Sequence, residues 1–400
     1  MNPLITPHEA EARIADKLPK LPAIECPLNK CAGRVLREVI NADRPVPPFN
    51  RAMMDGYAIR LADREHCNNF TICGQALAGC PQVALADEMG SCIEIMTGAV
   101  VPTGADCVVR YEDTQINSSG KMELIEGLKL EAGEAIHPIG SDQAEGTELI
   151  SAGRIIGSRE IGIAATCGHS TLEVAKLPAI TIVSTGDELV DVDTQPRAYQ
   201  LRRSNDIAIE TALARAHLHA EQRVTLPDDK DVSKEQLRKL TKKNNFLIIT
   251  GGISKGKKDY IPEVLNELGL KNHFHGVSQK PGKPFGYWSD EHCGVFALPG
   301  NPLSVLVGLH RYVLPALFKA MGAKASSPST VELIEDAPAH AKLTYFLPAK
   351  LLARGSAVAM PANNSGDLVS ILQTDGFIEL APSSSGEAPT GTDAPFIAWH

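Results

Sequence analysis

The chain alternates short apolar runs with amphipathic stretches between residues 179 and 322. The runs Ala179–Ser184, Phe246–Thr250 and Gly294–Leu298 have the length and continuous apolar character of buried strands. The amphipathic stretches predict helices over residues 205–217, 233–243, 260–269 and 302–321. Strands that alternate with helices are typical of a parallel α/β sheet. We therefore predict such a sheet at the centre of the fold.

The flanking segments have a different pattern. Residues 25–140 contain short strand-like runs punctuated by glycine and proline, which predicts an all-β module. These runs include Phe70–Cys73, Cys92–Met96 and Cys107–Tyr111. The stretch Ser326-Ser-Pro-Ser marks a boundary, and residues 327–400 again predict short strands joined by turns, as in a small β domain.

Helix signals occur outside the α/β region as well. Thr6-Pro7 is a cap followed by proline, which predicts a helix within residues 1–20. Residues 158–167 predict a further helix, followed by a strand over residues 171–175. The long helix over residues 302–321 carries Pro315, where we expect a kink.

Three turns rich in glycine and proline follow apolar runs within residues 246–304. They read Gly251-Gly-Ile-Ser-Lys-Gly-Lys-Lys, Lys280-Pro-Gly-Lys-Pro and Leu298-Pro-Gly-Asn-Pro-Leu-Ser. The carboxyl ends of strands in an open parallel sheet are where ligands bind. Backbone N–H groups and lysines at such an edge suit an anionic, phosphate-bearing ligand. The lysines are Lys255, Lys257, Lys258, Lys280 and Lys283.

The first turn nearly matches a P-loop, which requires Ser or Thr after its last lysine to hold magnesium. Lys258 stands there, so the pattern excludes a nucleotide hydrolase of that class. The glycines still allow the backbone to approach a ligand closely. Asp259 follows the turn and has two open interpretations: a carboxylate that complements the helix dipole, or a ligand of a divalent cation.

The turns after the other strands carry neutral polar side chains and acidic side chains. Asn301 suits a helix N-cap and Pro302 the first helical position, but capping does not explain Pro299-Gly300. The turn Ser184-Thr-Gly-Asp-Glu188 closes the first strand of the α/β region, and Pro227-Asp-Asp-Lys230 is a second acidic turn. These acidic turns either face a ligand or a metal, or are ordinary solvated loops.

Composition narrows the function classes. The net charge of −9 opposes a general nucleic-acid surface, and 5% aromatic residues offer few stacking platforms. The nine cysteines form no CxxC pair, which favours reduced thiols over disulfides or structural zinc. No apolar run approaches the ~18 residues of a membrane span. The N-terminus lacks a signal-peptide layout, so we expect a cytoplasmic protein.

Together, these segments resemble the molybdopterin molybdenumtransferase family, that is, MoeA and the E domain of gephyrin. The resemblance covers essentially the whole chain, and the matching stretches occur in the family's order. They are Met54-Asp-Gly-Tyr-Ala, Ile95-Met-Thr-Gly-Ala-Val-Val-Pro, Ser184-Thr-Gly-Asp-Glu-Leu, the three turns described above, Asn364-Ser-Gly-Asp-Leu-Val-Ser and Asp375-Gly-Phe-Ile-Glu-Leu.

The resemblance implies a multidomain α/β plus β fold that forms a homodimer. The expected domains are a central α/β molybdopterin-binding domain (residues 1–24 and 178–325), a small linking α+β domain (25–45 and 141–177), an inserted β domain (46–140) and a C-terminal β domain (326–400). It also implies insertion of molybdenum from molybdate into adenylylated molybdopterin with release of AMP, assisted by Mg²⁺ or another divalent cation. The implied partners are the molybdopterin adenylyltransferase and downstream cofactor-acceptor proteins.

The resemblance also assigns candidate residues. The catalytic candidates are Asp259, Glu188, Asp228 and Asp55, of which Glu188, Asp228 and Asp259 would arrange the metal. The substrate-binding candidates are Thr97, Thr185, Gly251, Gly252, Ser254, Lys280, Lys283, Pro299, Gly300, Asn301, Pro302 and Ser304. Asp55 and Thr97 would reach in from the partner subunit.

The chain departs from the family pattern at three places. Ala52-Met53 replaces Ser-Ala, His137 stands in a turn that is usually rich in arginine, and Arg203 replaces an acid near the expected site. These departures motivate two alternatives to the transferase. One is a non-catalytic scaffold that binds and delivers the cofactor, and the other is a paralogue that handles tungstate.

Overall fold

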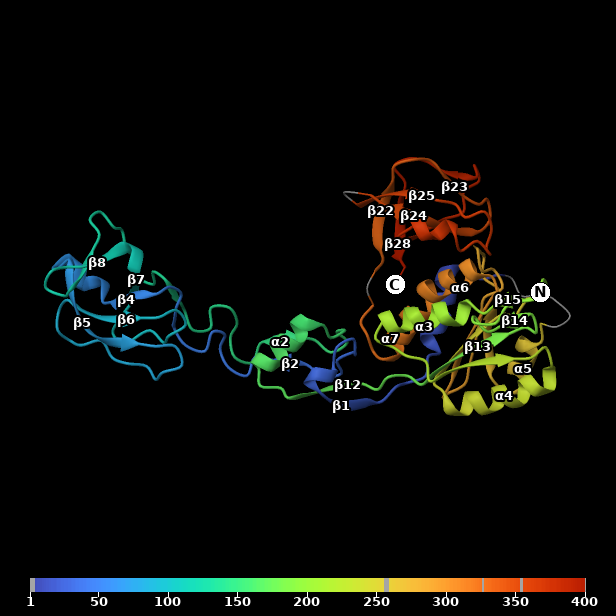
Figure 1. Ribbon diagram of the computed structural model, residues 1–400, viewed down its shortest axis with the longest axis horizontal. Coiled ribbons are helices and arrows are strands. Elements are labelled where there is room, and N and C mark those ends of the chain that lie inside the picture. Colours follow the sequence, from blue (N-terminus) through green and yellow to red (C-terminus); the bar gives the residue numbers. More distant parts are fainter. Residues whose placement is uncertain (1–3, 255–258, 326, 353–354, 400) are drawn as a thin grey trace. The chain divides into compact units, whose positions relative to one another are not determined.

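The computed structural model describes residues 4–254, 259–325, 327–352 and 355–399 (Figure 1). The chain forms two compact units. The first comprises Met1–Glu38, Ala152–Ile161 and Ser170–His400, and the second comprises Val39–Ser151 and Gly162–His169. This division is coarser than the four predicted domains, whose individual boundaries remain predictions.

A six-stranded sheet forms the centre of the first unit, in the order β16-β13-β17-β21-β20-β18. Its strands are β13 (Ile180–Thr185), β16 (Gln222–Leu226), β17 (Phe246–Thr250), β18 (Lys271–His275), β20 (Gly286–Ser289) and β21 (Gly294–Leu298). The first four strands in spatial order are parallel, while β20 and β18 are antiparallel to their neighbours. The predicted parallel α/β sheet is therefore confirmed, with an antiparallel extension that the sequence did not predict.

Helices cover both faces of this sheet. They are α1 (Pro7–Asp16), α3 (Asn205–Arg215), α4 (Lys230–Lys243), α5 (Ile261–Glu267), α6 (Pro302–Gly308) and α7 (Leu314–Ala320). Successive strand residues face opposite sides, so Phe246 and Ile248 pack with α3, α6 and α7, whereas Leu247 and Ile249 pack with α4 and α5. Figure 1 shows α4 and α5 together on one side of β13 and α3 on the other.

Two helices show how a capping side chain determines where a helix begins. Helix α1 begins after Thr6, whose hydroxyl accepts from the Glu9 amide while the Glu9 carboxylate accepts from the Thr6 amide, a complete capping box. Helix α4 starts at Lys230, three residues before the predicted start. The cause is Asp229, whose carboxylate accepts from the Val232 amide at 2.9 Å and caps the helix.

The last helical segment differs from the prediction of a simple kink at Pro315. A π-helical turn, Leu309–Val313, separates α6 from α7. Proline has no N–H, so Pro315 cannot donate to the carbonyl four residues earlier, and a wider turn accommodates this loss.

The same stretch qualifies the expectation that no apolar run approaches a membrane span. Residues Pro302–Ala320 form a helical stretch of 19 residues with a mean hydropathy of 1.2. By length and composition alone, this stretch could cross a membrane. However, 72% of that window is buried inside the fold, as in a core helix. Leu309, Val313 and Leu317 are among its buried side chains.

A five-stranded barrel follows the sheet in the first unit. Its strands are β22 (Ser329–Leu333), β24 (Thr344–Leu351), β25 (Ser356–Ala359), β26 (Gly376–Leu380) and β28 (Asp393–Ala398), and pairing of β24 with β26 closes it. A short strand from the α/β region, β19 (Gln279–Lys280), adds to β24 in parallel, with Gln279 opposite Thr344 and Lys280 opposite Tyr345. The barrel is thus joined directly to the predicted lysine turn.

The second unit contains its own six-stranded sheet, in the order β7-β4-β6-β5-β9-β8. Its strands are β4 (Gly56–Ile59), β5 (Asn69–Ala76), β6 (Ser91–Ile95), β7 (Cys107–Arg110), β8 (Thr114–Ile116) and β9 (Met122–Leu124). The strands predicted around residues 70, 92 and 107 are all present. Apolar clusters on both faces of the sheet form the core of this unit.

Short elements complete the fold. The helix α2 (Ser158–Thr166) contributes residues to both units. The short strands pair as β1 (Ala23–Pro27) with β12 (Thr171–Ala175), β2 (Ile40–Asn41) with β11 (Glu148–Ile150), β3 (Arg51–Ala52) with β10 (Ile136–His137), β14 (Leu189–Val190) with β15 (Leu201–Arg202), and β23 (Ala337–Pro338) with β27 (Glu387–Ala388).

Candidate functional site

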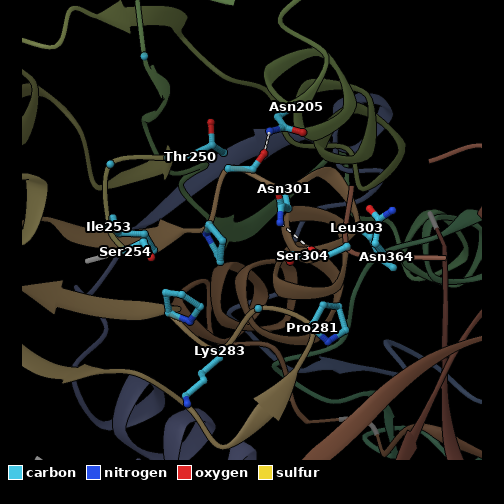
Figure 2. Close-up of a pocket in the computed structure, with 18 of the residues that line it drawn as sticks. Asn205, Thr250, Ile253, Ser254, Pro281, Lys283, Asn301, Leu303, Ser304 and Asn364 are labelled. Atoms are coloured by element: carbon cyan, nitrogen blue, oxygen red, sulfur yellow. Dashed lines mark hydrogen bonds between the residues drawn. The ribbon is translucent and has the colours of Figure 1, made fainter. Parts of the chain in front are cut away.

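A cavity of about 940 Å³ lies at the carboxyl ends of β13, β17 and β21. From β13 the chain runs through α3 to β16 on one side, then through α4 to β17 on the other. The strand order therefore reverses between β13 and β17, and open α/β sheets bind ligands at such a switch point. Figure 2 shows Ser254, Lys283, Asn301 and Asn364, from four separate segments, around this cavity.

Most of the predicted site residues line the cavity. They are Thr185, Glu188, Asp228, Gly251, Gly252, Ser254, Asp259, Lys280, Lys283, Pro299, Gly300, Asn301 and Ser304. Pro302 is not among the lining residues. It occupies the first position of α6, where a missing N–H costs no hydrogen bond. Lys255, Lys257 and Lys258 lie outside the described residues.

The loops after β13 and β17 pack against each other through two glycines. Gly251 and Gly252 have φ values of +87° and +66°, a region that L side chains rarely adopt. A Cβ atom on Gly251 would lie 2.7 Å from Thr185 Oγ1, and one on Gly252 would lie 2.8 Å from Ile261 Cγ1. The Thr185 hydroxyl also donates to the Thr250 carbonyl at 3.3 Å. Glycine is therefore required at both positions for the two loops to meet.

The loop after β21 completes this edge. The Gly251 amide donates to the Leu298 carbonyl at 3.0 Å, and Asn205 Nδ2 donates to the Gly300 carbonyl at 2.8 Å (Figure 2). Asn301 stands at the N-cap of α6, as predicted, but makes no side-chain cap bond. Its Nδ2 instead donates to Ser365 Oγ at 2.6 Å. The amide thus connects the helix start to the barrel.

The lysine turn forms another wall. Lys280 and Lys283 are exposed, and both line the cavity. The ammonium group of Lys280 lies 4.7 Å from the ring centroid of Tyr345 on β24, a cation–π contact. This contact and the β19–β24 ladder orient Lys280 at the cavity edge.

The acidic groups lie on the loops after β13, β16 and β17. The Asp228 amide donates to the Asp187 carboxylate at 3.1 Å, and the Tyr260 hydroxyl donates to the Pro227 carbonyl at 2.7 Å. Burial raises the pKa of Tyr260, and the carboxylates of Asp228 and Asp187 add to the rise. The edge therefore carries negative groups on one part and lysines on another.

These carboxylates do not form a ready-made metal centre. Across residues 4–254, 259–325, 327–352 and 355–399, no group of three or more His, Cys, Asp or Glu side chains is gathered closely enough to hold an ion. Glu188, Asp228 and Asp259 nevertheless line one cavity. This donor set fits Mg²⁺ shared between carboxylates and substrate phosphates, and does not fit an all-protein cage.

The barrel supplies lining residues that sequence reasoning missed. They are Tyr345, Phe346, Pro348, Ala362, Asn363, Asn364 and Ser365. The Leu303 amide donates to the Ser365 carbonyl at 3.0 Å, which ties this loop to α6. The stretch at Asn364 carries a family resemblance, and that was the one sequence signal for its location. Its position at the cavity depends on long-range strand pairing.

Asp367 organises this barrel loop. Its carboxylate accepts hydrogen bonds from the Asn363 amide and side chain, the Val369 amide, and the amide and hydroxyl of Ser370. These hydrogen bonds, those from Ser370 first, lower the pKa of Asp367 from its ordinary value of 3.8. A lowered pKa means that the ionised carboxylate stabilises the folded loop above pH 3.8, and that this stabilisation is lost as the pH falls through the lowered pKa.

We expect Asp367→Ala to increase hydrogen exchange several-fold in residues 363–370. Mass spectrometry of the corresponding peptide at neutral pH measures the change. Asp393→Ala, which removes an exposed carboxylate of β28, is the matched control. Equal exchange in both variants would show that the loop holds its shape without the Asp367 carboxylate.

Asp55 and Thr97 lie together in the second unit. The Asp55 carboxylate accepts from the amide of Thr97 at 2.6 Å and from its hydroxyl at 2.7 Å. These bonds, the backbone bond first, lower the pKa of Asp55 and keep it ionised. Both residues are exposed, and neither belongs to the set that lines the cavity of the first unit. Their predicted approach to the cavity of a partner subunit remains a proposal.

Two of the departures from the family pattern contact neighbouring acidic side chains. Arg203 donates to Asp191 and to Thr225, and it is not among the cavity-lining residues. His137 lies 2.8 Å from Asp142. The expected extra charge of Arg203 is thus paired with a neighbouring acid.

A doubly wound sheet with a switch-point cavity and an attached barrel defines a ligand-binding α/β protein. Residues 5–168 match the family model "MoeA N-terminal region (domain I and II)", and residues 181–319 match "Probable molybdopterin binding domain". The chain belongs to the molybdopterin molybdenumtransferase family, the family of MoeA.

Individual relatives agree with this assignment. The chain is 38% identical over 374 residues to a molybdopterin molybdenumtransferase of Synechocystis, covering 92% of this chain and 93% of the relative. It is 32% identical over 337 residues to gephyrin of Dictyostelium discoideum, covering 74% of this chain and 46% of that protein. The crystal structure of a molybdopterin biosynthesis MoeA protein from Pyrococcus horikoshii superposes with a TM-score of 0.82 at 25% identity, covering 99% and 100% of the two chains.

Proposed function

We propose that this protein is a molybdopterin molybdenumtransferase, which inserts molybdenum from molybdate into adenylylated molybdopterin and releases AMP. The observation that carries the proposal is the cavity at the switch point. It gathers the glycine loops, the two lysines and three acidic residues that the family resemblance assigns to this reaction. The share of the chain covered by the Synechocystis relative, 92%, supports the extension to the whole chain.

The chain's own groups suit the substrate. The phosphates of adenylylated molybdopterin would bind near the glycines 251 and 252 and the ammonium groups of Lys280 and Lys283. Charge-assisted hydrogen bonds from lysine are strong and also attract the molybdate oxyanion. The same groups would stabilise the negative charge of AMP as it leaves.

A divalent cation is part of the proposal. Glu188, Asp228 and Asp259 would hold Mg²⁺ jointly with the phosphate oxygens of the substrate. A bound cation withdraws charge from the phosphoryl group during bond cleavage. We also propose that the protein acts as a cytoplasmic homodimer, with Asp55 and Thr97 of a partner subunit completing the cavity. It would receive substrate from the molybdopterin adenylyltransferase and pass product to cofactor-acceptor proteins.

The test is molybdate-dependent AMP release by the purified full-length protein supplied with adenylylated molybdopterin. We expect release to require molybdate, to stop when a chelator removes divalent cations, and to resume when Mg²⁺ is added back. Tight binding of adenylylated molybdopterin without AMP release would instead favour the non-catalytic scaffold. Faster release with tungstate than with molybdate would favour the paralogue that handles tungstate.

A further inference from the structure

A buried side-chain relay lies directly behind the lysine turn. Gln279 is 1% exposed, and its Nε2 donates to the carbonyls of Pro281 at 3.1 Å and Gly282 at 3.4 Å. Its Oε1 accepts from the hydroxyl of Tyr312 at 2.5 Å. The Gln279 amide therefore donates to the turn through its nitrogen and accepts from Tyr312 through its oxygen.

The structure fits closely around this amide. Gly282 has a φ of +85°, and a Cβ atom there would lie 2.9 Å from Gln279 Nε2. Glycine at position 282 therefore lets the amide reach the turn that it supports. The Gly282 carbonyl also accepts from the Phe285 amide at 3.0 Å, so Gln279 and the turn's own backbone share an acceptor.

The other end of the relay is fixed by the π-helical turn. Tyr312 lies within Leu309–Val313 and is 2% exposed. Its ring stacks on Phe285 with centroids 4.8 Å apart, and Phe346 packs edge-on at 6.4 Å. Burial raises the pKa of Tyr312, so its hydroxyl stays protonated and remains a donor. Single π-helical turns inside α-helices frequently occur at functional sites.

We propose that Gln279 and Tyr312 are positioning residues that hold the Lys280–Lys283 turn in the geometry that binds the anionic groups of the substrate. Gln279 adjoins Lys280 in the chain and holds both residues between the two lysines through their carbonyls. A long, exposed lysine binds an anion best when its backbone is already ordered, because less freedom is lost on binding. The inference rests on the proposed function, since the lysines must be substrate ligands.

The test compares Tyr312→Phe with Tyr287→Phe in the full-length protein. Both tyrosines are buried, and the Tyr287 hydroxyl donates to the Lys17 carbonyl at 3.1 Å, away from the lysine turn. Each variant keeps the aromatic ring and removes one buried hydroxyl, so we expect similar losses of thermal stability. Only Tyr312→Phe should accelerate hydrogen exchange at the Phe285 amide, read by mass spectrometry with fragmentation to single residues.

Kinetics then separates positioning from packing. We expect Tyr312→Phe to raise KM for adenylylated molybdopterin about fivefold with kcat unchanged, as when binding shared by ground and transition states is lost. Gln279→Leu should give a similar rise, and combining it with Tyr312→Phe should add little, because both interrupt one relay. If Gln279→Leu fails to fold, the comparison of the two tyrosine variants decides alone.

Two results would overturn the inference: equal exchange at Phe285 in the two tyrosine variants, or equal KM values in them while the wild type releases AMP. Failure of the proposed function is recognised separately, because the wild-type protein would then release no AMP. In that case the lysines would have no substrate to bind, and the proposed positioning role would be wrong. Faster exchange in Tyr312→Phe would still show that the hydrogen bonds of Gln279 and Tyr312 support the turn.

Discussion

Replacing Asp259 with alanine is expected to lower molybdate-dependent AMP release by about 100-fold or more, the scale of losing one electrostatic group at a reacting centre. Asp259 lines the cavity next to the glycine loop and precedes α5. Without its carboxylate, the substrate phosphates and the cation lose one of three shared acidic partners. Single-turnover measurement of AMP release checks the effect.

The fold should survive this change. Asp231→Ala is the matched control, because Asp231 is an exposed carboxylate in the first turn of α4 and is not among the cavity-lining residues. Both variants should keep the wild-type circular dichroism spectrum. Wild-type turnover in Asp259→Ala would remove this residue from the mechanism.

Lys280→Ala is expected to weaken binding of adenylylated molybdopterin by about 1–3 kcal/mol, the contribution of charge-assisted hydrogen bonds. Salt screens exposed charges, so added KCl should weaken the wild type more than the variant. Fluorescence or calorimetric titration of the full-length protein at two salt concentrations measures both effects.

Lys350→Ala provides the comparison for that experiment. Lys350 is an exposed lysine on β24, the strand that also carries Tyr345, and it is not among the cavity-lining residues. Like Lys280→Ala, the Lys350→Ala substitution removes one lysine charge. It leaves the cation–π contact of Lys280 with Tyr345 in place. If the two variants bind substrate equally and show the same salt dependence, Lys280 is no ligand.

Two strands that the sequence predicted in the central sheet are buried on both faces. All residues of β17 and β21 are buried, and they appear in the sequence as continuous apolar runs. Two of the strands that the sequence did not predict have mixed patterns. β16 lies at the sheet edge and has a single buried residue, and β18 reads Lys-Asn-His-Phe-His, again with one buried residue. Apolar periodicity cannot identify strands of that kind, because their place is set by their neighbours.

The residues of the candidate site also fall into two groups, those that a local sequence pattern predicted and those that it did not. Gly251, Lys280 and Asn301 were predicted because glycine, proline and lysine at strand ends carry a local signal. Tyr345 carried no such signal, since it reaches the cavity through pairing of β19 with β24, which joins segments far apart in the sequence. The hydrogen bond between Gln279 and Tyr312 is similarly nonlocal, and a buried glutamine cannot be recognised before its partners are known.

The parallel pairing of β19 with β24 limits how far this protein can be shortened. Removing the barrel would strip the ladder partners from residues 279 and 280 and take away the ring beneath the Lys280 ammonium group. Bare strand edges invite association with other chains. An α/β sheet produced without the barrel would therefore keep most of the predicted ligand contacts. These contacts would lie beside an exposed strand edge that associates with other chains. The minimal working version must include the C-terminal barrel.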